Sequence, residues 1–180
     1  GGNSFSGAAS PGTDKTLTTV GSYSVTESGP AGYDDSYSSD CNGSIALGQT
    51  KTCTITNNDV APTITLIKVV ENDNGGNAGP NDFGISIGGQ AVTSGDPQEV
   101  NANTSLAINE TGLSGYSFVS ITGDAKCPSS LGGTVTLNEG EDVTCTITNN
   151  DVAPSLTLVK EVTNNNGGTA TASEWTLTAS

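Results

Sequence analysis

The stretch CTITNNDVAP occupies residues 53–62 and occurs again, letter for letter, at residues 145–154. The copies stay in step beyond it, because TITLIKVVENDNGG from Thr63 is matched by SLTLVKEVTNNNGG from Ser155. A repeat at a fixed spacing, here 92 residues, is typical of an array in which each copy is one small domain. Residues 63–154 form a complete repeat. Residues 1–62 correspond to the C-terminal part of one repeat, and residues 155–180 to the N-terminal part of the next.

The composition favours β-structure throughout. Apolar residues fall in short alternating runs, and no window carries the apolar stripe of a helix or the length of a membrane span. We expect strands near residues 63–70, 83–87, 104–110, 116–122, 134–137 and 142–149, separated by turns rich in Gly, Asn and Pro. The sequence therefore predicts an all-β protein of tandem immunoglobulin-like β-sandwich repeats, each about 90 residues long.

The charge excludes several partners. The net charge is −14, and the five basic residues are all lysines, which argues against nucleic acid and anionic membranes as ligands. An acidic surface also keeps exposed strand edges from associating. We expect an extracellular or cell-surface location, with no direct membrane insertion in these residues.

The four cysteines follow the repeat. Cys41 lies 12 residues before Cys53, and Cys127 lies 18 residues before Cys145. Neither pair has the spacing of a zinc site, and the chain has no histidine. The pattern predicts the disulfides Cys41–Cys53 and Cys127–Cys145, one per copy, in an oxidising environment, and the alternative is reduced, buried thiols. With only 4% aromatic residues, each small core needs such reinforcement.

Three strands of the complete repeat each end their apolar face with a polar residue. Because side chains along a strand alternate between two faces, these residues share the face of the apolar residues before them. They are Lys68, Glu110 and Asn149. An isolated buried charge is very costly, so we expect the three to meet in the interior. The partial repeats carry the counterparts Glu27, Asn57 and Lys160.

This arrangement resembles the collagen-adhesin B-type (CnaB) or prealbumin-like repeat of bacterial surface proteins and pilins. The matching motifs are ITLIKVV, the closing CTITN, and VTESGPAGY, which is close to that family's E-T-x-x-P-x-G-Y; the complete repeat has INETGLSGY, without the proline. The resemblance implies an isopeptide bond between Lys68 and Asn149, promoted by Glu110, in a single self-modification rather than enzymatic turnover. The alternative is a buried Lys–Glu pair, hydrogen-bonded to Asn149 and never crosslinked. Lys160 would need an Asn beyond Ser180, and Asn57 a Lys before Gly1.

Other candidate sites are weaker. The loops at residues 71–74 and 81–82 offer oxygen ligands for Ca²⁺ but lack the pattern of a known calcium loop, and turn formation explains them better. We expect no metal and no cofactor. Asn42, Asn103 and Asn109 lie in N-x-S/T sequons and are candidate glycosylation sites. No triad or phosphate-binding motif is visible, so we expect no enzyme activity.

Two functions fit these features. The first is a structural repeat of an extracellular filament, pilus or adhesin stalk. The alternative is an adhesive module that binds matrix, glycan or another surface, for which the outward threonine rows beside Cys53 and Cys145 are candidates. Because the partial repeats together make one full copy, we expect copies of the chain to complete each other head to tail. This filament is either one continuous polypeptide or a series of strand-donating subunits.

Overall fold

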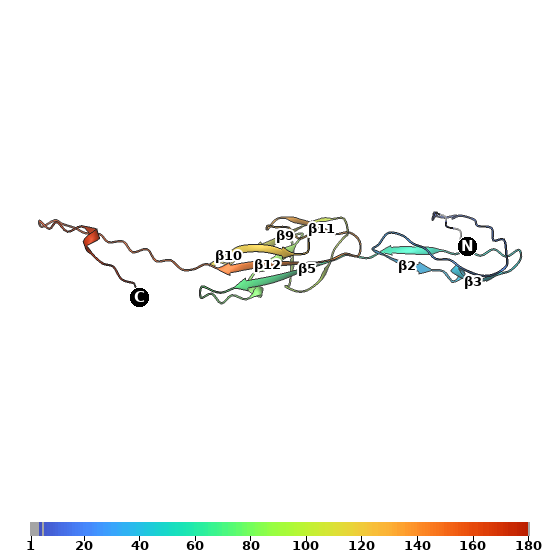
Figure 1. Cartoon of the computed structure of the whole chain (residues 1–180), viewed down its shortest axis with the longest axis horizontal. Coiled ribbons are helices and arrows are strands. Elements are labelled where there is room, and N and C mark those ends of the chain that lie inside the picture. The colour runs from blue at the N-terminus through green and yellow to red at the C-terminus, as the bar shows by residue number, and fades with distance from the viewer. Residues whose placement is uncertain (1–3, 5, 180) are drawn as a thin grey trace. The chain divides into compact units, whose positions relative to one another are not determined.

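The structure is a computed structural model that describes residues 4 and 6–179, and it is built from strands (Figure 1). Among these residues there is no α-helix, only the single 3₁₀ turns η1 (Ser39–Cys41), η2 (Pro80–Asp82) and η3 (Ala172–Glu174). The strands are β1 (Gly21–Ser24), β2 (Tyr33–Tyr37), β3 (Asn42–Ile45), β4 (Ile55–Asp59), β5 (Thr63–Glu71), β6 (Gly84–Ile87), β7 (Gln90–Val92), β8 (Gln98–Glu99), β9 (Ser105–Thr111), β10 (Tyr116–Gly123), β11 (Thr134–Thr136) and β12 (Asp142–Asp151). The predicted all-β class is confirmed.

The described chain divides into two compact units. One comprises the residues up to 64 together with 98–105 and 136–143, and the other comprises residues 65–97, 106–135 and those from 144 onward. No helix in the described part of the chain has the length and apolar character needed to cross a membrane.

The complete repeat contains two four-stranded sheets. Their strand orders are β10-β12-β5-β8 and β11-β9-β6-β7. The six expected strands all form, each within two residues of its expected ends. The sequence did not reveal the short strands β7 and β8, of three and two residues.

The alternation of side chains along the strands decides which residues form the core. Along β12 the residues at every second position, from Val143 to Asp151, are buried, while Thr144 between them is exposed. On β5, Ile64 and Leu66 are fully buried. Several other apolar residues of the same interior are fully buried too. The fully buried apolar side chains are Ile64, Leu66, Ile108, Leu137, Val135, Cys145 and Ile147, with Pro62. The interior is thus small and aliphatic.

The described residues of the N-terminal partial repeat form two-stranded sheets. One pairs β1 with β3 and the other pairs β2 with β4, both antiparallel. The second pair keeps the register of the complete repeat, because Tyr33 lies opposite Asp59 as Tyr116 lies opposite Asp151. The closing half of a repeat therefore forms its local strand pairs without the opening half.

The C-terminal partial repeat forms no strand within residues 152–179. Residues 155–163 repeat the sequence pattern of β5, and as a strand they would turn Leu156 and Leu158 inward, but these side chains are 72% and 48% exposed. The absence of this strand has a physical reason. In the complete repeat the corresponding strand β5 lies between β12 and β8, and no described strand pairs with residues 155–163. An unpaired strand leaves its backbone groups without partners.

Candidate self-crosslinking site

Three strands bring one polar side chain each to the same point of the interior. Lys68 comes from β5, Glu110 from β9 and Asn149 from β12. The Lys68 Nζ lies 2.6 Å from Asn149 Oδ1 and 2.9 Å from Glu110 Oε2, and Asn149 Nδ2 donates to Glu110 Oε1 over 2.6 Å. The three residues thus close a ring of contacts, as their shared facing predicted.

The site excludes water. The side chains of Lys68 and Glu110 are 0% and 1% exposed, and Asn149 is 1% exposed. Burial lowers the pKa of the Lys68 amine, and the hydrogen bond and charge of Glu110 offset only part of that effect. Because a neutral amine is a nucleophile and an ammonium is not, this environment favours the reactive form of Lys68.

The ring of Phe83 covers the amine, and a second aromatic ring packs against Phe83. The Lys68 Nζ lies 4.4 Å from the centre of the Phe83 ring, within cation–π range. Phe83 is 4% exposed and meets Tyr116 edge to face, with ring centres 5.5 Å apart. Phe83 follows η2 at the end of the loop formed by residues 72–82. The position of this loop therefore determines how the amine is shielded.

The buried carboxylate of Asp151, at the end of β12, holds the same loop. Its oxygens accept backbone hydrogen bonds from Asp73 and Asn74 at 3.0 Å and from Gly76 at 2.6 Å. Burial alone would raise the pKa of the Asp151 carboxyl, but these bonds and the Asn74 side chain outweigh it and hold the pKa below its ordinary value. Tyr116 adds to the clamp, because its Oη donates to Asn72 over 2.5 Å and accepts from the Ala78 amide over 2.8 Å.

Sequence reasoning missed the roles of Asp151 and Tyr116. A signal was present, because Asp151 belongs to the repeated CTITNNDVAP and shares the face of Asn149 two residues earlier. In the loop at residues 71–74, the candidate calcium ligand set, Asp73 and Asn74 instead donate to the Asp151 carboxylate, and Gly76 just beyond the loop does so too. Among the described residues there is no group of three His, Cys, Asp or Glu side chains arranged to hold a metal ion.

The arrangement places a proton carrier between two nitrogens. One oxygen of Glu110 contacts the Lys68 amine, and the other contacts the Asn149 amide nitrogen. Attack of Nζ on the Asn149 side-chain carbonyl requires a proton to leave the first nitrogen and another to reach the second. A single carboxyl group that touches both can carry out both transfers. The geometry is therefore suited to amide exchange.

The partial repeats hold separated halves of the same arrangement. Asn57 Nδ2 donates a short hydrogen bond to Glu27 Oε1, as Asn149 does to Glu110, but both residues are exposed. Lys160 Nζ lies 4.4 Å from the centre of the Trp175 ring, and Lys68 Nζ lies equally far from the centre of the Phe83 ring. The structure thus pairs Glu27 with Asn57 and Lys160 with Trp175.

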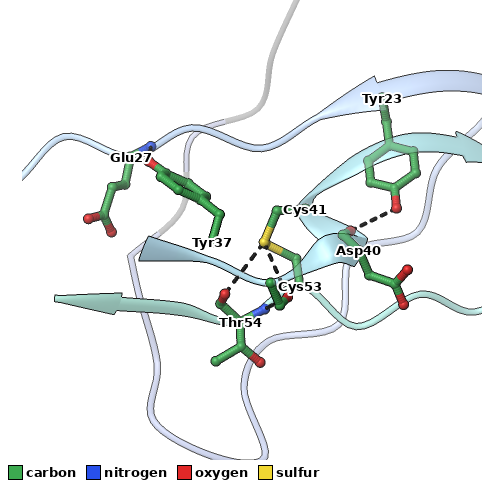
Figure 2. Close-up of a disulfide and its surroundings, with 8 residues drawn as sticks. Tyr23, Glu27, Tyr37, Asp40, Cys41, Cys53 and Thr54 are labelled. Atoms are coloured by element: carbon green, nitrogen blue, oxygen red, sulfur yellow. Dashed lines mark hydrogen bonds between the residues drawn. A yellow bond between two sulfur atoms is a disulfide. The ribbon is translucent and has the colours of Figure 1, made fainter. Parts of the chain in front are cut away.

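Each cysteine pair is joined. The Cys41–Cys53 bond, drawn in Figure 2, has a Cα–Cα distance of 4.5 Å, and the Cys127–Cys145 bond one of 5.7 Å. Cys41 and Cys145 are buried, at 2% and 0% exposure, so each bond ties a less buried partner to the interior. In Figure 2 the Tyr23 hydroxyl donates over 2.7 Å to the backbone carbonyl of Asp40, the residue before Cys41.

The three sequon asparagines are exposed. Asn42 begins β3, and Asn109 lies on β9 beside Glu110 but on its outward face. Asn103 has a positive φ of 58° and donates through its side chain to Glu139 over 2.8 Å. All three remain candidates for glycosylation, although the amide nitrogen of Asn103 is engaged by Glu139.

Comparison with known protein families gives a match that recurs along the chain. The model of the SpaA_2 family, described as a prealbumin-like fold domain, matches residues 1–61, 59–147 and 151–180. No curated protein and no solved structure matches the chain. The three matched segments follow the repeat seen in the sequence.

Proposed function

The chain belongs to the SpaA_2 family of prealbumin-like fold domains, and from this premise we propose that it is a structural part of an extracellular filament, pilus or adhesin stalk. Repeats of this family are typical of surface proteins, in which they serve as structural domains. The disulfides agree with a secreted location, since such bonds persist outside the cytosol. Copies of the chain are the partners of this structure, arranged head to tail.

The observation that carries the proposal is the buried contact of Lys68 with Asn149 and Glu110. It joins the first and last strands of the complete repeat, β5 and β12, which are neighbours in one sheet. A covalent bond at this point would close the repeat on itself. Such a bond would let a thin core withstand heat, proteases and tension.

The reaction is an exchange of one amide for another. Lys68 passes a proton to Glu110 Oε2, and the neutral Nζ attacks Cγ of Asn149. The bond from Cγ to Nδ2 breaks as Glu110 delivers a proton to that nitrogen and takes one from Nζ. Ammonia leaves, a secondary amide joins the two side chains, and the last proton remains on Glu110 or departs with ammonia as ammonium. No redox partner is needed.

The strand directions suit a load-bearing role. β5 and β12 point the same way in Figure 1, and Thr63 lies by Asp142 while Lys68 lies by Asn149 further along both strands. Tension applied through the chain before β5 and after β12 therefore shears the two strands along their length. A Lys68–Asn149 bond would carry that tension directly and shield the residues between them.

Intact-mass measurement of the purified, reduced chain tests the crosslink. We expect the chain to weigh less than its sequence by one ammonia molecule, and the Lys68→Ala chain to show its full sequence mass. Lys51→Ala is the matched control, since Lys51 is exposed and pairs with Asp40 at the surface. A full sequence mass for the unaltered chain would contradict the crosslink.

Pulling on single molecules tests the mechanical role. With the Cys127–Cys145 bond reduced, we expect the complete repeat of the unaltered chain to resist extension, and the Lys68→Ala repeat to unfold and release the chain between residues 68 and 149. Equal extension of the two chains would show that no bond shields this segment.

A further inference from the structure

An asparagine followed by a glycine lies in the loop that Asp151 holds. Asn74 is exposed, and Gly75 after it has a φ of 97°, in the left-handed region that favours glycine. The Gly75 amide nitrogen donates no hydrogen bond within the described part of the chain. Such a nitrogen, unbonded and not crowded by a side chain, can attack the side-chain carbonyl of the preceding asparagine and close a five-membered ring. The loop therefore contains both reactants of an asparagine deamidation.

Hydrogen bonds restrain the Asn74 side chain against that reaction. Its Nδ2 donates to Asp73 Oδ1 over 2.5 Å and to the Asp151 backbone carbonyl over 3.1 Å. A longer bond of 3.2 Å reaches Asp151 Oδ1. The backbone amide of Asn74 also donates to both carboxylate oxygens of Asp151, each over 3.0 Å. Because ring closure requires Asn74 Cγ to turn to the Gly75 nitrogen, the side-chain bonds must first break.

Asp151 is the residue on which this restraint depends. Its carboxylate also accepts from the amides of Asp73 and Gly76, so it fixes the backbone on both sides of Gly75. It comes from β12, 77 positions after Asn74 in the sequence. The restraint therefore exists only while the loop is docked against the folded sheet. Local opening of the loop releases it.

We propose that Asn74 is a deamidation site that these hydrogen bonds to Asp151 protect and that reacts when the loop opens. The Gly75 nitrogen attacks Asn74 Cγ, its proton passes through water to Nδ2, and ammonia leaves behind a cyclic imide. Water then adds to one of the two imide carbonyls. Opening of the ring gives aspartate or isoaspartate at position 74. Water is the only co-reactant, and neither an oxidant nor a reductant is needed.

The converted loop does not dock as before. The product replaces an amide that donates three hydrogen bonds by a carboxylate that donates none, beside the carboxylates of Asp73 and Asp151. Like charges at this distance repel each other. The loop leads to Phe83, which covers the Lys68 amine, so a converted chain keeps a loosened cover over that amine. The modification thus makes a transient opening of the loop permanent.

Conversion rates in the folded and the unfolded chain test the proposal. The unaltered, Asp151→Asn and Asp59→Asn chains are incubated in heavy-oxygen water at mildly alkaline pH, with and without denaturant. Peptide mapping then measures the gain in mass at Asn74. Folded Asp151→Asn should convert at least about tenfold faster than the folded unaltered chain, since it loses hydrogen bonds to a charged acceptor. Folded Asp59→Asn should match the unaltered chain, and all three should convert equally in denaturant.

Two further chains complete the design. Asn74→Gln keeps an amide donor, but its longer side chain does not close the five-membered ring, so the gain in mass should disappear. If Asp151→Asn does not fold, Tyr116→Phe decides, because it removes the hydroxyl that bonds to Asn72 and Ala78 and leaves Asp151 in place. Folded Tyr116→Phe should also convert faster than the unaltered chain.

Three results overturn the proposal. The first is a folded unaltered chain that converts at its rate in denaturant, and the second is a folded Asp151→Asn chain, or Tyr116→Phe in its place, that converts no faster. The third is a gain in mass that persists in Asn74→Gln. Proteases should cut residues 72–82 faster in converted than in unconverted molecules, and equal cutting would refute the loosened loop. Reaction at Lys68 is read separately, because crosslinking lowers the mass and deamidation raises it.

Discussion

The ten residues CTITNNDVAP occur twice with the same letters but in two environments. In the complete repeat Asn149 is 1% exposed and Asp151 6%, whereas their counterparts Asn57 and Asp59 are both exposed. The partner strand is present both times, since β10 pairs with β12 as β2 pairs with β4. What differs is the opening half, whose strands β5 and β6 complete the sheets of the complete repeat. Segments that are distant in the sequence therefore decide whether these polar groups are buried.

Local hydrogen bonding is the same in both environments. The amide of Asn57 reaches Glu27 although both are exposed, just as Asn149 reaches Glu110 in the interior. The strand pairs and the contact of two side chains need only the closing half. The desolvation that lowers the pKa of Lys68 needs the complete sandwich. Equivalent substitutions in the two repeats should therefore have unequal effects.

The largest difference is expected between Lys68→Ala and Lys160→Ala. Removal of Lys68 leaves the buried Glu110 without its counter-charge and prevents the crosslink, at a cost of about 3–5 kcal/mol in unfolding free energy. Removal of the half-buried Lys160 should change the stability of the isolated chain by less than about 0.5 kcal/mol. Denaturant unfolding at a protein concentration too low for association measures both. Equal losses of unfolding free energy would mean that the burial of Lys68 does not make it more important for stability than Lys160.

Removal of either disulfide should have more similar effects than the two lysine substitutions. The main difference should be the part of the chain that each disulfide protects. Replacing Cys127 and Cys145 together by serine should lower the stability of the complete repeat by about 3 kcal/mol, because the closed loop is freed in the unfolded state. The same change at Cys41 and Cys53 should leave the complete repeat unaffected and increase cleavage within residues 21–59. Limited proteolysis with mass identification of the fragments distinguishes the two. Identical cleavage maps would contradict independent roles for the two bonds.

A smaller effect is expected from the loop clamp. Asp151→Asn replaces an acceptor of several hydrogen bonds and should lower the melting temperature by about 5 °C. Asp59→Asn is the matched control and should leave the melting temperature unchanged, since Asp59 is exposed. In the Asp151→Asn chain we also expect slower loss of ammonia, because the loop that carries Phe83 is held less firmly. If both variants have the same melting temperature, the hydrogen bonds between Asp151 and the loop do not contribute to stability.

The smallest effect is a change in stability with pH. The pKa of Asp151 is lower in the folded chain than its ordinary value of 3.8. Its contribution to stability is therefore fully present above pH 3.8 and is lost as the pH falls through the lower folded pKa. Melting temperatures measured between about pH 2 and pH 6 should fall at the acid end, and less steeply for Asp151→Asn than for Asp59→Asn. Parallel curves for the two variants would assign the acid sensitivity to other carboxyls.

The sequence by itself determined the repeat, six strands of the complete repeat and the inward-facing residues on them. Alternation along β12 was enough to place Cys145 and Asn149 on one buried face, because a strand turns successive side chains to opposite sides whatever lies around it. The cost of burying an unpaired charge was then enough to predict that Lys68 and Glu110 would meet Asn149.

Only the tertiary structure decided which copies of these motifs are buried and how the site is enclosed. Residues 155–163 repeat the pattern of β5 almost unchanged, yet they form no strand, because backbone pairing requires a neighbour that the local sequence does not specify. The clamp by Asp151 was likewise hidden, since its donors at residues 73–76 lie far away in sequence. The side on which a residue's side chain lies is set by its own strand. Its burial and its hydrogen-bond partners depend on segments that only the folded sheets bring together.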